Sequence, residues 1–108
     1  MSKVLDVSDE SFDREVLQSE LPVLVDFWGD HCPACLQISP ILEELARERV
    51  GNAKIVKVHA AENVLASSQY GVRAMPTVLA FFQGTVHGQL VGARPKSAFV
   101  DLLEAILR

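Results

Sequence analysis

The sequence is poor in the features that mark membrane proteins, nucleic-acid-binding proteins and disulfide-stapled proteins. It holds only two cysteines in 108 residues, and none of its apolar runs approaches the roughly 20 residues of a membrane span. Ten basic residues against fourteen acidic ones give a net charge of −4, without a basic cluster. We therefore expect neither a membrane nor a nucleic acid as a partner.

The N-terminal segment MSKVLDVSDESF lacks both the apolar core and the small-residue cleavage site of a signal peptide. This absence predicts a cytoplasmic protein, in a compartment where lasting disulfides are rare. No repeat, low-complexity tract or linker interrupts a composition that is 49% hydrophobic and 22% charged. Such a chain fits a single domain over residues 1–108, which can bury a core without a metal or a disulfide.

Strand-like and helix-like patterns alternate along the chain. The expected helices open near Ser8, cover residues 33–48 with a kink at Pro40, cover residues 62–70, and end the chain. The expected strands cover residues 3–7, 22–28, 54–59, 76–82 and 85–91, with a hairpin across Gln83–Gly84. This order predicts an α/β fold, with a central mixed sheet of about five strands flanked on both faces by about four helices.

Cys32 and Cys35 can in principle bind a metal, close a structural loop or exchange electrons. Structural zinc needs four ligands, and the three histidines lack the paired spacing that would complete a site, so we expect no metal. The histidines His59 and His87 are expected to lie on the surface without a function. A structural disulfide would close a very short loop and remove little entropy from the unfolded chain.

The electron-exchange use has a positive physical argument. Proline is favoured at the first position of a helix, so Pro33 places Cys32 at the N-cap, with its sulfur facing unpaired backbone N–H groups. This environment stabilises a thiolate. Cys35 follows one turn later on the same side of the helix but deeper, so one sulfur can attack while the other resolves. Asp26, in a buried strand, is expected to have a raised pKa.

Several landmarks then occur in a familiar order and spacing. They are VLVDFW before the cysteines, the C-x-x-C pair itself, Pro40 in PILEELA, the segment YGVRAMPT, the hairpin glycine Gly84, and Gly92. In this order the chain resembles the thioredoxin family over essentially its whole length. The resemblance implies the thioredoxin-like fold and a thiol–disulfide oxidoreductase that reduces protein disulfides through the Cys32–Cys35 pair.

The resemblance also implies roles for individual residues. Cys32 would be the nucleophile and Cys35 the resolving thiol. Asp26 would manage the proton of Cys35, and Lys57 would be the lysine beside that acid. A cis peptide bond would place Pro76 against the disulfide. The other implied docking residues, where a substrate chain would lie, are Trp28, Met75, Val91 and Gly92. The family further implies a monomer without a bound cofactor, which receives electrons from a thioredoxin-reductase-type enzyme driven by NADPH or ferredoxin.

The site segment departs from the usual WCGPCK, since this chain has HCPACL. Because Pro33 has moved forward, Ala34 regains a backbone N–H, which we expect to donate to the Cys32 sulfur. A hydrogen bond to a charged acceptor contributes up to about 3 kcal/mol, which corresponds to a potential several tens of millivolts more oxidising. His31, when protonated, would also stabilise a Cys32 thiolate. Leu36 replaces a lysine and would alter recognition by a reductase.

Two alternative functions remain open at this point. The first is a thiol oxidase or isomerase with a more oxidising, glutaredoxin-like potential. The second is a non-catalytic binding module that uses the thioredoxin surface, although the two cysteines, Asp26 and the Met75–Thr77 segment argue against it.

Overall fold

The computed structural model describes residues 2–106 and contains one mixed five-stranded sheet. The strands are β1 (Leu5–Asp6), β2 (Val23–Trp28), β3 (Lys54–His59), β4 (Thr77–Phe82) and β5 (Thr85–Val91). Their spatial order is β1-β3-β2-β4-β5, in which the first three are mutually parallel and β4 is antiparallel to both of its neighbours. The mixed sheet of five strands is therefore confirmed.

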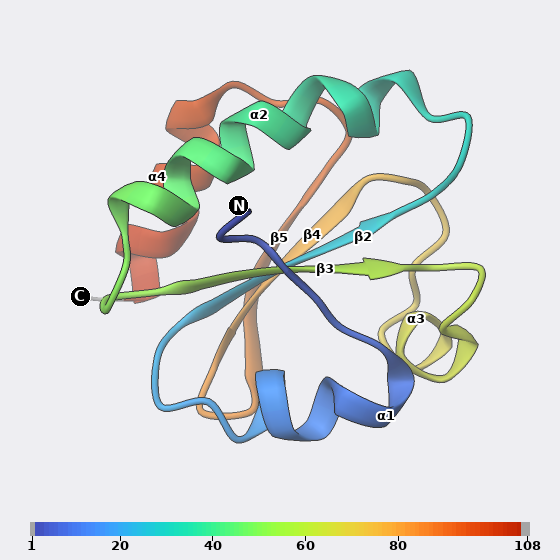
Figure 1. The fold of residues 1–108 in the computed structure, drawn as a ribbon, viewed down its shortest axis with the longest axis horizontal. Helices are drawn as coiled ribbons and strands as arrows, with labels where there is room; N and C mark the ends of the chain where they lie inside the picture. Colours follow the sequence, from blue (N-terminus) through green and yellow to red (C-terminus); the bar gives the residue numbers. More distant parts are fainter. Residues whose placement is uncertain (1, 107–108) are drawn as a thin grey trace.

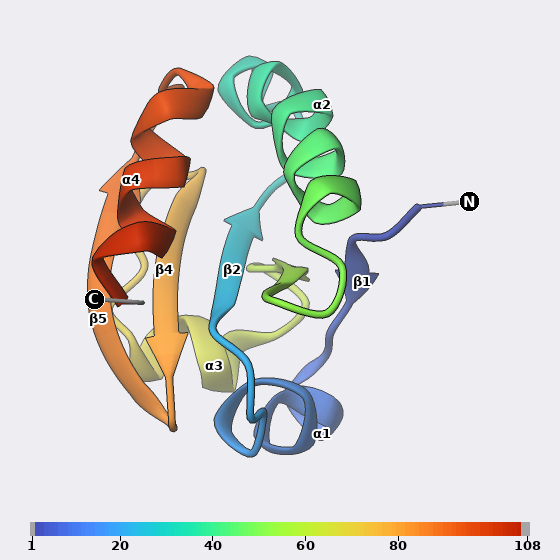
Figure 2. The same ribbon diagram turned by 90° about the vertical axis from the view of Figure 1, so that its left-hand side faces the viewer.

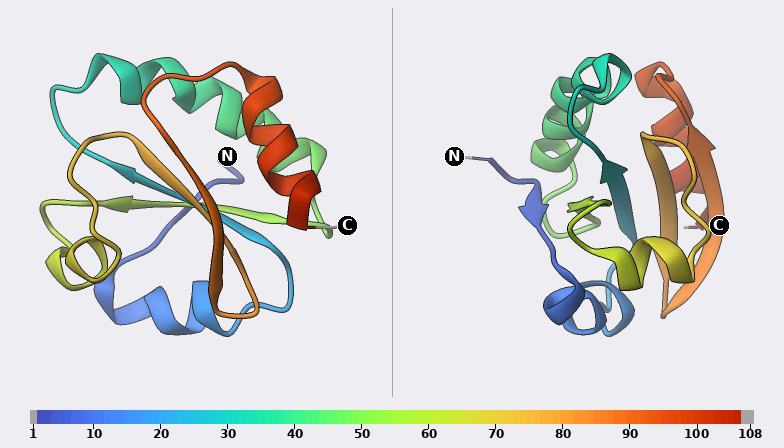
Figure 3. Two further views of the ribbon diagram at one scale, coloured as in Figure 1. Left: turned by 180° about the vertical axis from the view of Figure 1, so that it is seen from behind. Right: turned by 90° about the vertical axis from the view of Figure 1, so that its right-hand side faces the viewer.

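Helices cover both faces of this sheet. They are α1 (Asp9–Phe12), continued by the π-helical turn η1 (Asp13–Leu17), then α2 (Pro33–Glu48), α3 (Val64–Gln69) and α4 (Lys96–Ile106). Figures 1 and 2 show α2 and α4 together on one face and α1 and α3 on the other, and Figure 3 shows the same layers from two further sides. The expected α/β class with helices on both faces is confirmed.

Four elements are shorter than the sequence patterns predicted. In β1, only Leu5 and Asp6 pair with β3. Strands β2 and β4 begin at Val23 and Thr77, each one residue after the proline at which the pattern started, because proline has no N–H to donate to a sheet. Helix α3 begins at Val64 rather than at residue 62, because the Asn63 side chain accepts the Asp9 N–H and donates to the His59 carbonyl.

The alternation of side chains along the strands builds two separate cores. The core beneath α1 and α3 takes Val23, Val25 and Phe27 from β2, whereas the core beneath α2 and α4 takes Leu24 from the same strand. Asp26 and Trp28 follow Leu24 on that second face. The functional residues of β2 thus point toward α2, which carries the cysteines.

The chain passes directly from the carboxyl end of β2 into α2. Three residues, Gly29 to His31, link Trp28 to Cys32, and His31 takes a positive φ of 53° in this turn. The carboxyl end of β3 lies beside it, because Trp28 pairs with His59. Ligand sites of α/β sheets gather at such carboxyl ends.

Candidate active site

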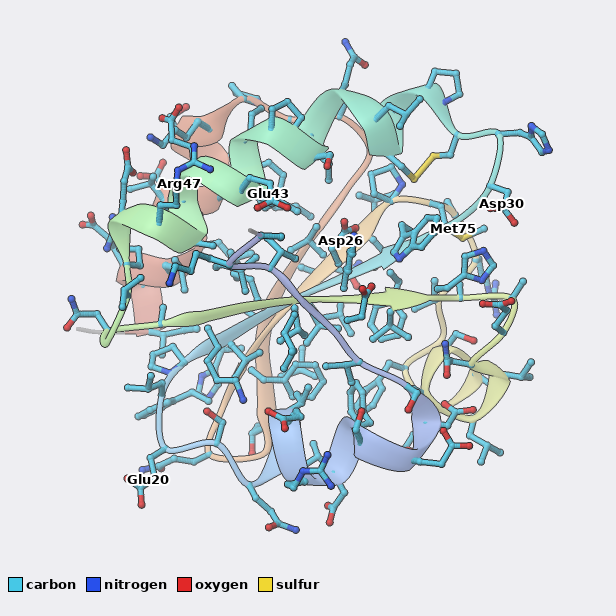
Figure 4. All side chains as sticks on the ribbon, in the orientation of Figure 1. Glu20, Asp26, Asp30, Glu43, Arg47 and Met75 are labelled. Atoms are coloured by element: carbon cyan, nitrogen blue, oxygen red, sulfur yellow. A yellow bond between two sulfur atoms is a disulfide. The ribbon has the colours of Figure 1, made fainter. Side chains whose placement is uncertain are left out.

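Cys32 and Cys35 form a disulfide at the N-terminus of α2 (Figure 4), with their Cα atoms 5.2 Å apart. Cys32 is the N-cap residue and Pro33 follows it at the start of the helix, as the sequence predicted. The Cys35 N–H donates to Cys32 Sγ at 3.1 Å. A backbone N–H of the first helical turn, which has no partner within the helix, is thus directed at this sulfur. The arrangement favours negative charge on Cys32 when the pair is reduced.

In the disulfide form, no hydrogen bond joins the Ala34 N–H to Cys32 Sγ among the described residues. An N-cap side chain accepts from the second or the third helical residue, and here the donor is the third, Cys35. The N–H of Cys35 is present whichever of residues 33 and 34 is proline. The more oxidising potential was argued from a contact to the Cys32 thiolate of the reduced protein, and it stays a prediction.

The two sulfur-bearing residues differ in exposure. Cys32 is half-buried, whereas Cys35 is only 7% exposed. A bulky disulfide can approach Cys32 but not Cys35. This difference agrees with the expected division between an outer and an inner cysteine.

Asp26 lies beneath the disulfide on the central strand β2 and is only 6% exposed. Burial raises the pKa of Asp26 to about 7, while the positive charge of Lys57 acts in the opposite direction. Its Oδ1 atom has no hydrogen-bond partner among the described residues. Asp26 and Lys57 are directly paired across β2 and β3, and both line a cavity of about 420 Å³ together with Cys32 and Cys35. The expected raised pKa is confirmed.

Lys57 has two further neighbours at the edge of this cavity. Its Nζ lies 3.8 Å from Asp6 Oδ1 on β1 and 5.9 Å from the centre of the Trp28 ring. Asp6 was not singled out from the sequence, because the contact depends on the parallel pairing of β1 with β3. Lys57 is thus shared between an exposed carboxylate and the buried one.

A second segment meets the disulfide from β4. The Met75–Pro76 bond is cis, and the Met75 carbonyl oxygen lies 3.6 Å from Cys32 Sγ. The Gly92 N–H donates to the Pro76 carbonyl at 2.9 Å, with Gly92 at a positive φ of 88°. The side chains of Met75 and Val91, which flank these two glycine- and proline-linked segments, expose apolar surface. The structure therefore brings Met75, Pro76 and Gly92 to Cys32, while the half-buried Trp28 lines the cavity with both cysteines.

His31 and Leu36 flank the cysteines and both face solvent. Leu36 is 74% exposed and lines the same cavity as His31. Among the described residues, no hydrogen bond joins the His31 ring to either sulfur. An electrostatic influence of His31 on Cys32 stays a prediction.

The expectation that His59 is a surface residue is wrong. Its side chain is only 13% exposed, packs against Trp28, and places Nε2 at 3.0 Å from Asp30 Oδ2. The two six-residue strand patterns VLVDFW and KIVKVH could have indicated this neighbour. When the two segments are placed side by side as parallel strands, with their first residues paired, Trp28 lies beside His59. His87, in contrast, is exposed as expected.

Neither a metal-binding cluster nor a membrane-spanning helix occurs in the described part of the chain. Between residues 2 and 106, no group of three or more His, Cys, Asp and Glu side chains is arranged to hold a metal ion. None of the helices in that range has the length and the apolar character needed to cross a bilayer.

Comparison with known proteins identifies the family. The thioredoxin family model matches residues 3–105. The chain belongs to the thioredoxin family. It is 43% identical to the thioredoxin of Synechocystis sp. over 99% of this chain and 100% of that protein. It is 42% identical to thioredoxin 1 of Nostoc sp. over 96% of this chain and 97% of that protein, and 41% identical to the thioredoxin of Haemophilus influenzae over 95% and 96%.

Membership of the thioredoxin family and the Cys32–Cys35 disulfide together make the chain a dithiol–disulfide oxidoreductase with a protein disulfide reductase role. The family implies disulfide-containing substrates and a reductase as partners. The two alternatives, an oxidase or isomerase and a non-catalytic binding module, are not favoured by these relatives.

Proposed function

We propose that Cys32 is the nucleophile and Cys35 the resolving residue of a reductase for protein disulfides. The unequal burial of the two cysteines carries this proposal. In the reduced protein, the Cys32 thiolate attacks one target sulfur, and the other target sulfur leaves as a thiolate that takes up a proton. Cys35 then attacks Cys32 Sγ, which releases the second target thiol and re-forms the Cys32–Cys35 disulfide.

Asp26 would accept the proton of Cys35 as that residue becomes a nucleophile. A carboxyl group with a pKa of about 7 changes charge in the range where this transfer is needed. Lys57 would stabilise the charged form of Asp26, because its positive charge lowers the pKa of that carboxyl. Both side chains line the cavity that Cys35 also lines, which supports a short path for the proton.

The substrate would dock on the surface formed by Trp28, Met75, Pro76, Val91 and Gly92. Met75 and Val91 contribute exposed apolar area, at 41% and 40%, and the Met75 carbonyl oxygen lies 3.6 Å from Cys32 Sγ. The hydrogen bond between Gly92 and Pro76 holds the two segments together at 2.9 Å. An extended substrate strand beside Met75 would bring its own disulfide to Cys32.

Trapping tests the order of attack. Oxidised insulin serves as the protein substrate, and dithiothreitol supplies the electrons for wild-type turnover. Cys35→Ser should accumulate a mixed disulfide between Cys32 and the substrate, because the resolving step is blocked. Cys32→Ser should trap none. Equal trapping by both variants, or a mixed disulfide on Cys35 alone, would contradict the assignment.

We propose that the electron donor is a thioredoxin-reductase-type enzyme, driven by NADPH or by ferredoxin. We expect this enzyme to contact the Leu36 side chain. At 74% exposure this side chain meets any protein that reaches the disulfide. Leu36→Lys should change the rate of reduction by an NADPH-driven thioredoxin reductase by about threefold to tenfold, a typical range for one interface residue. The dithiothreitol-driven rate serves as the control. Equal changes in the reductase-driven and the dithiothreitol-driven rates would show that the reductase does not recognise Leu36.

Pro33 and Ala34 between the cysteines and His31 before them would tune the reactivity of Cys32, which rates measured against pH in wild type and His31→Ala would test. We also propose a cytoplasmic monomer that forms one domain. The continuous sheet and its two cores support the single domain.

A further inference from the structure

Four side chains form a block at the carboxyl ends of β2 and β3, on the face toward α2. Asp26 pairs with Lys57 and Trp28 pairs with His59, so the four share one face of the sheet. Three of them already have proposed roles in proton transfer or docking. His59 is the fourth member and has none.

The His59 ring is held in a definite orientation. Its Nδ1 accepts the Glu62 backbone N–H at 3.3 Å, so the proton of a neutral ring lies on Nε2. Nε2 then donates to Asp30 Oδ2 at 3.0 Å. Asp30 belongs to the three-residue turn that leads from Trp28 to Cys32. One hydrogen bond therefore ties this turn to β3.

The same ring also orients the Trp28 indole. The two ring centres are 4.5 Å apart and the planes meet at 83°, which is the edge-to-face arrangement that aromatic pairs favour. Trp28 Nε1 is buried without a hydrogen-bond partner among the described residues. No hydrogen bond from the described chain thus fixes the indole. The Lys57 ammonium lies 5.9 Å from the ring centre, and the closer ring contact with His59 sets the tilt of the indole.

We propose that His59 is a positioning residue for protein substrates, which fixes the Trp28 ring and the Asp30 turn beside Cys32. The inference rests on the proposed docking role of Trp28. Loss of His59 should weaken the docking of a large disulfide substrate more than it slows the attack of Cys32 on a small one, because a small disulfide needs little of the surface.

The test compares His59→Ala and His59→Gln with wild type. Glutamine can keep a donor for Asp30 but loses the aromatic contact, and alanine loses both. The protein substrate is oxidised insulin, and the small one is the aromatic disulfide 5,5′-dithiobis(2-nitrobenzoic acid). The loss in kcat/KM for insulin with His59→Ala should exceed the loss in the rate with the small disulfide by about threefold to tenfold, through KM.

Trp28 fluorescence gives an independent readout, because Trp28 is the only tryptophan. Its emission should shift in both variants, and His59→Gln should recover part of the insulin activity through Asp30. Asp30→Ala combined with His59→Ala should lose less than the sum of the two single effects. Equal losses with both substrates, or unchanged kinetics and emission, would overturn the proposal. Wild-type turnover of insulin tests the underlying reductase function separately.

Discussion

The two faces of strand β2 carry very different side chains. Toward α1 and α3, the strand presents Val23, Val25 and Phe27, each no more than 1% exposed. Toward α2 it presents Leu24 and then Asp26 and Trp28. Asp26 is a buried carboxyl, and the Trp28 N–H has no hydrogen-bond partner among the described residues. One strand thus combines a face that only packs with a face that becomes polar as it approaches the disulfide. The apolar face should stabilise the fold. The polar face should lower the stability, because it buries groups that the reaction needs.

The largest expected effect comes from the packing face. Phe27→Ala should lower the free energy of unfolding by about 3–5 kcal/mol, because it empties space in a core where Phe27 is fully buried. Urea unfolding at 25 °C measures the change. The folded fraction should reduce insulin at the wild-type rate, since Phe27 points away from the site. A loss below about 1 kcal/mol would mean that this core closes around the gap.

On the other face, removing the charge of Asp26 should instead raise the free energy of unfolding. Its folded pKa of about 7 exceeds its ordinary value of 3.8, so the native state binds a proton more tightly than the unfolded state does. The stability of the wild type should therefore fall as the pH rises from about 4 to about 7, and the full penalty should remain above that range. Neutral Asp26→Asn removes the penalty and should unfold with a flatter pH profile.

The size of this effect follows from the shift of about three pKa units. At pH 8, Asp26→Asn should be more stable than wild type by up to about 4 kcal/mol, with little difference near pH 4. Urea unfolding at both pH values measures it. Asp101→Asn, a change at an exposed position of α4, is the matched control. A variant that gains nothing at pH 8 would show that Asp26 is not strained by burial.

The features that the sequence predicts correctly depend on the residues of a single segment. Periodic apolar residues locate helix α2 at its observed bounds of Pro33–Glu48, and a carboxyl within an apolar strand is enough to expect the raised pKa of Asp26. The bounds of α2 and the raised pKa of Asp26 can therefore be predicted from the local sequence pattern alone.

The features that the sequence missed share the opposite property, since they concern contacts between segments or the directions of N–H groups. His59 was assigned to the surface because its burial depends on the register of β2 against β3. In the disulfide form the donor to Cys32 Sγ is Cys35 rather than Ala34, and the choice between two successive N–H groups depends on the geometry of one helical turn. The contact between Lys57 and Asp6 likewise requires the position of β1.

The smallest expected effect tests the coupling within the polar face. Lys57→Met keeps the length of the side chain but removes the charge that lowers the pKa of Asp26, so that pKa should rise above about 7. A carbon-13 NMR titration of the Asp26 carboxyl measures it directly. Lys54→Met is the matched control, because Lys54 lies at the other end of β3 and pairs with Glu15 at 2.9 Å. If both variants left the Asp26 titration where it is, burial alone would set the charge of the site. A rise in the Lys57 variant only would show that the paired strands control the proton beneath the disulfide.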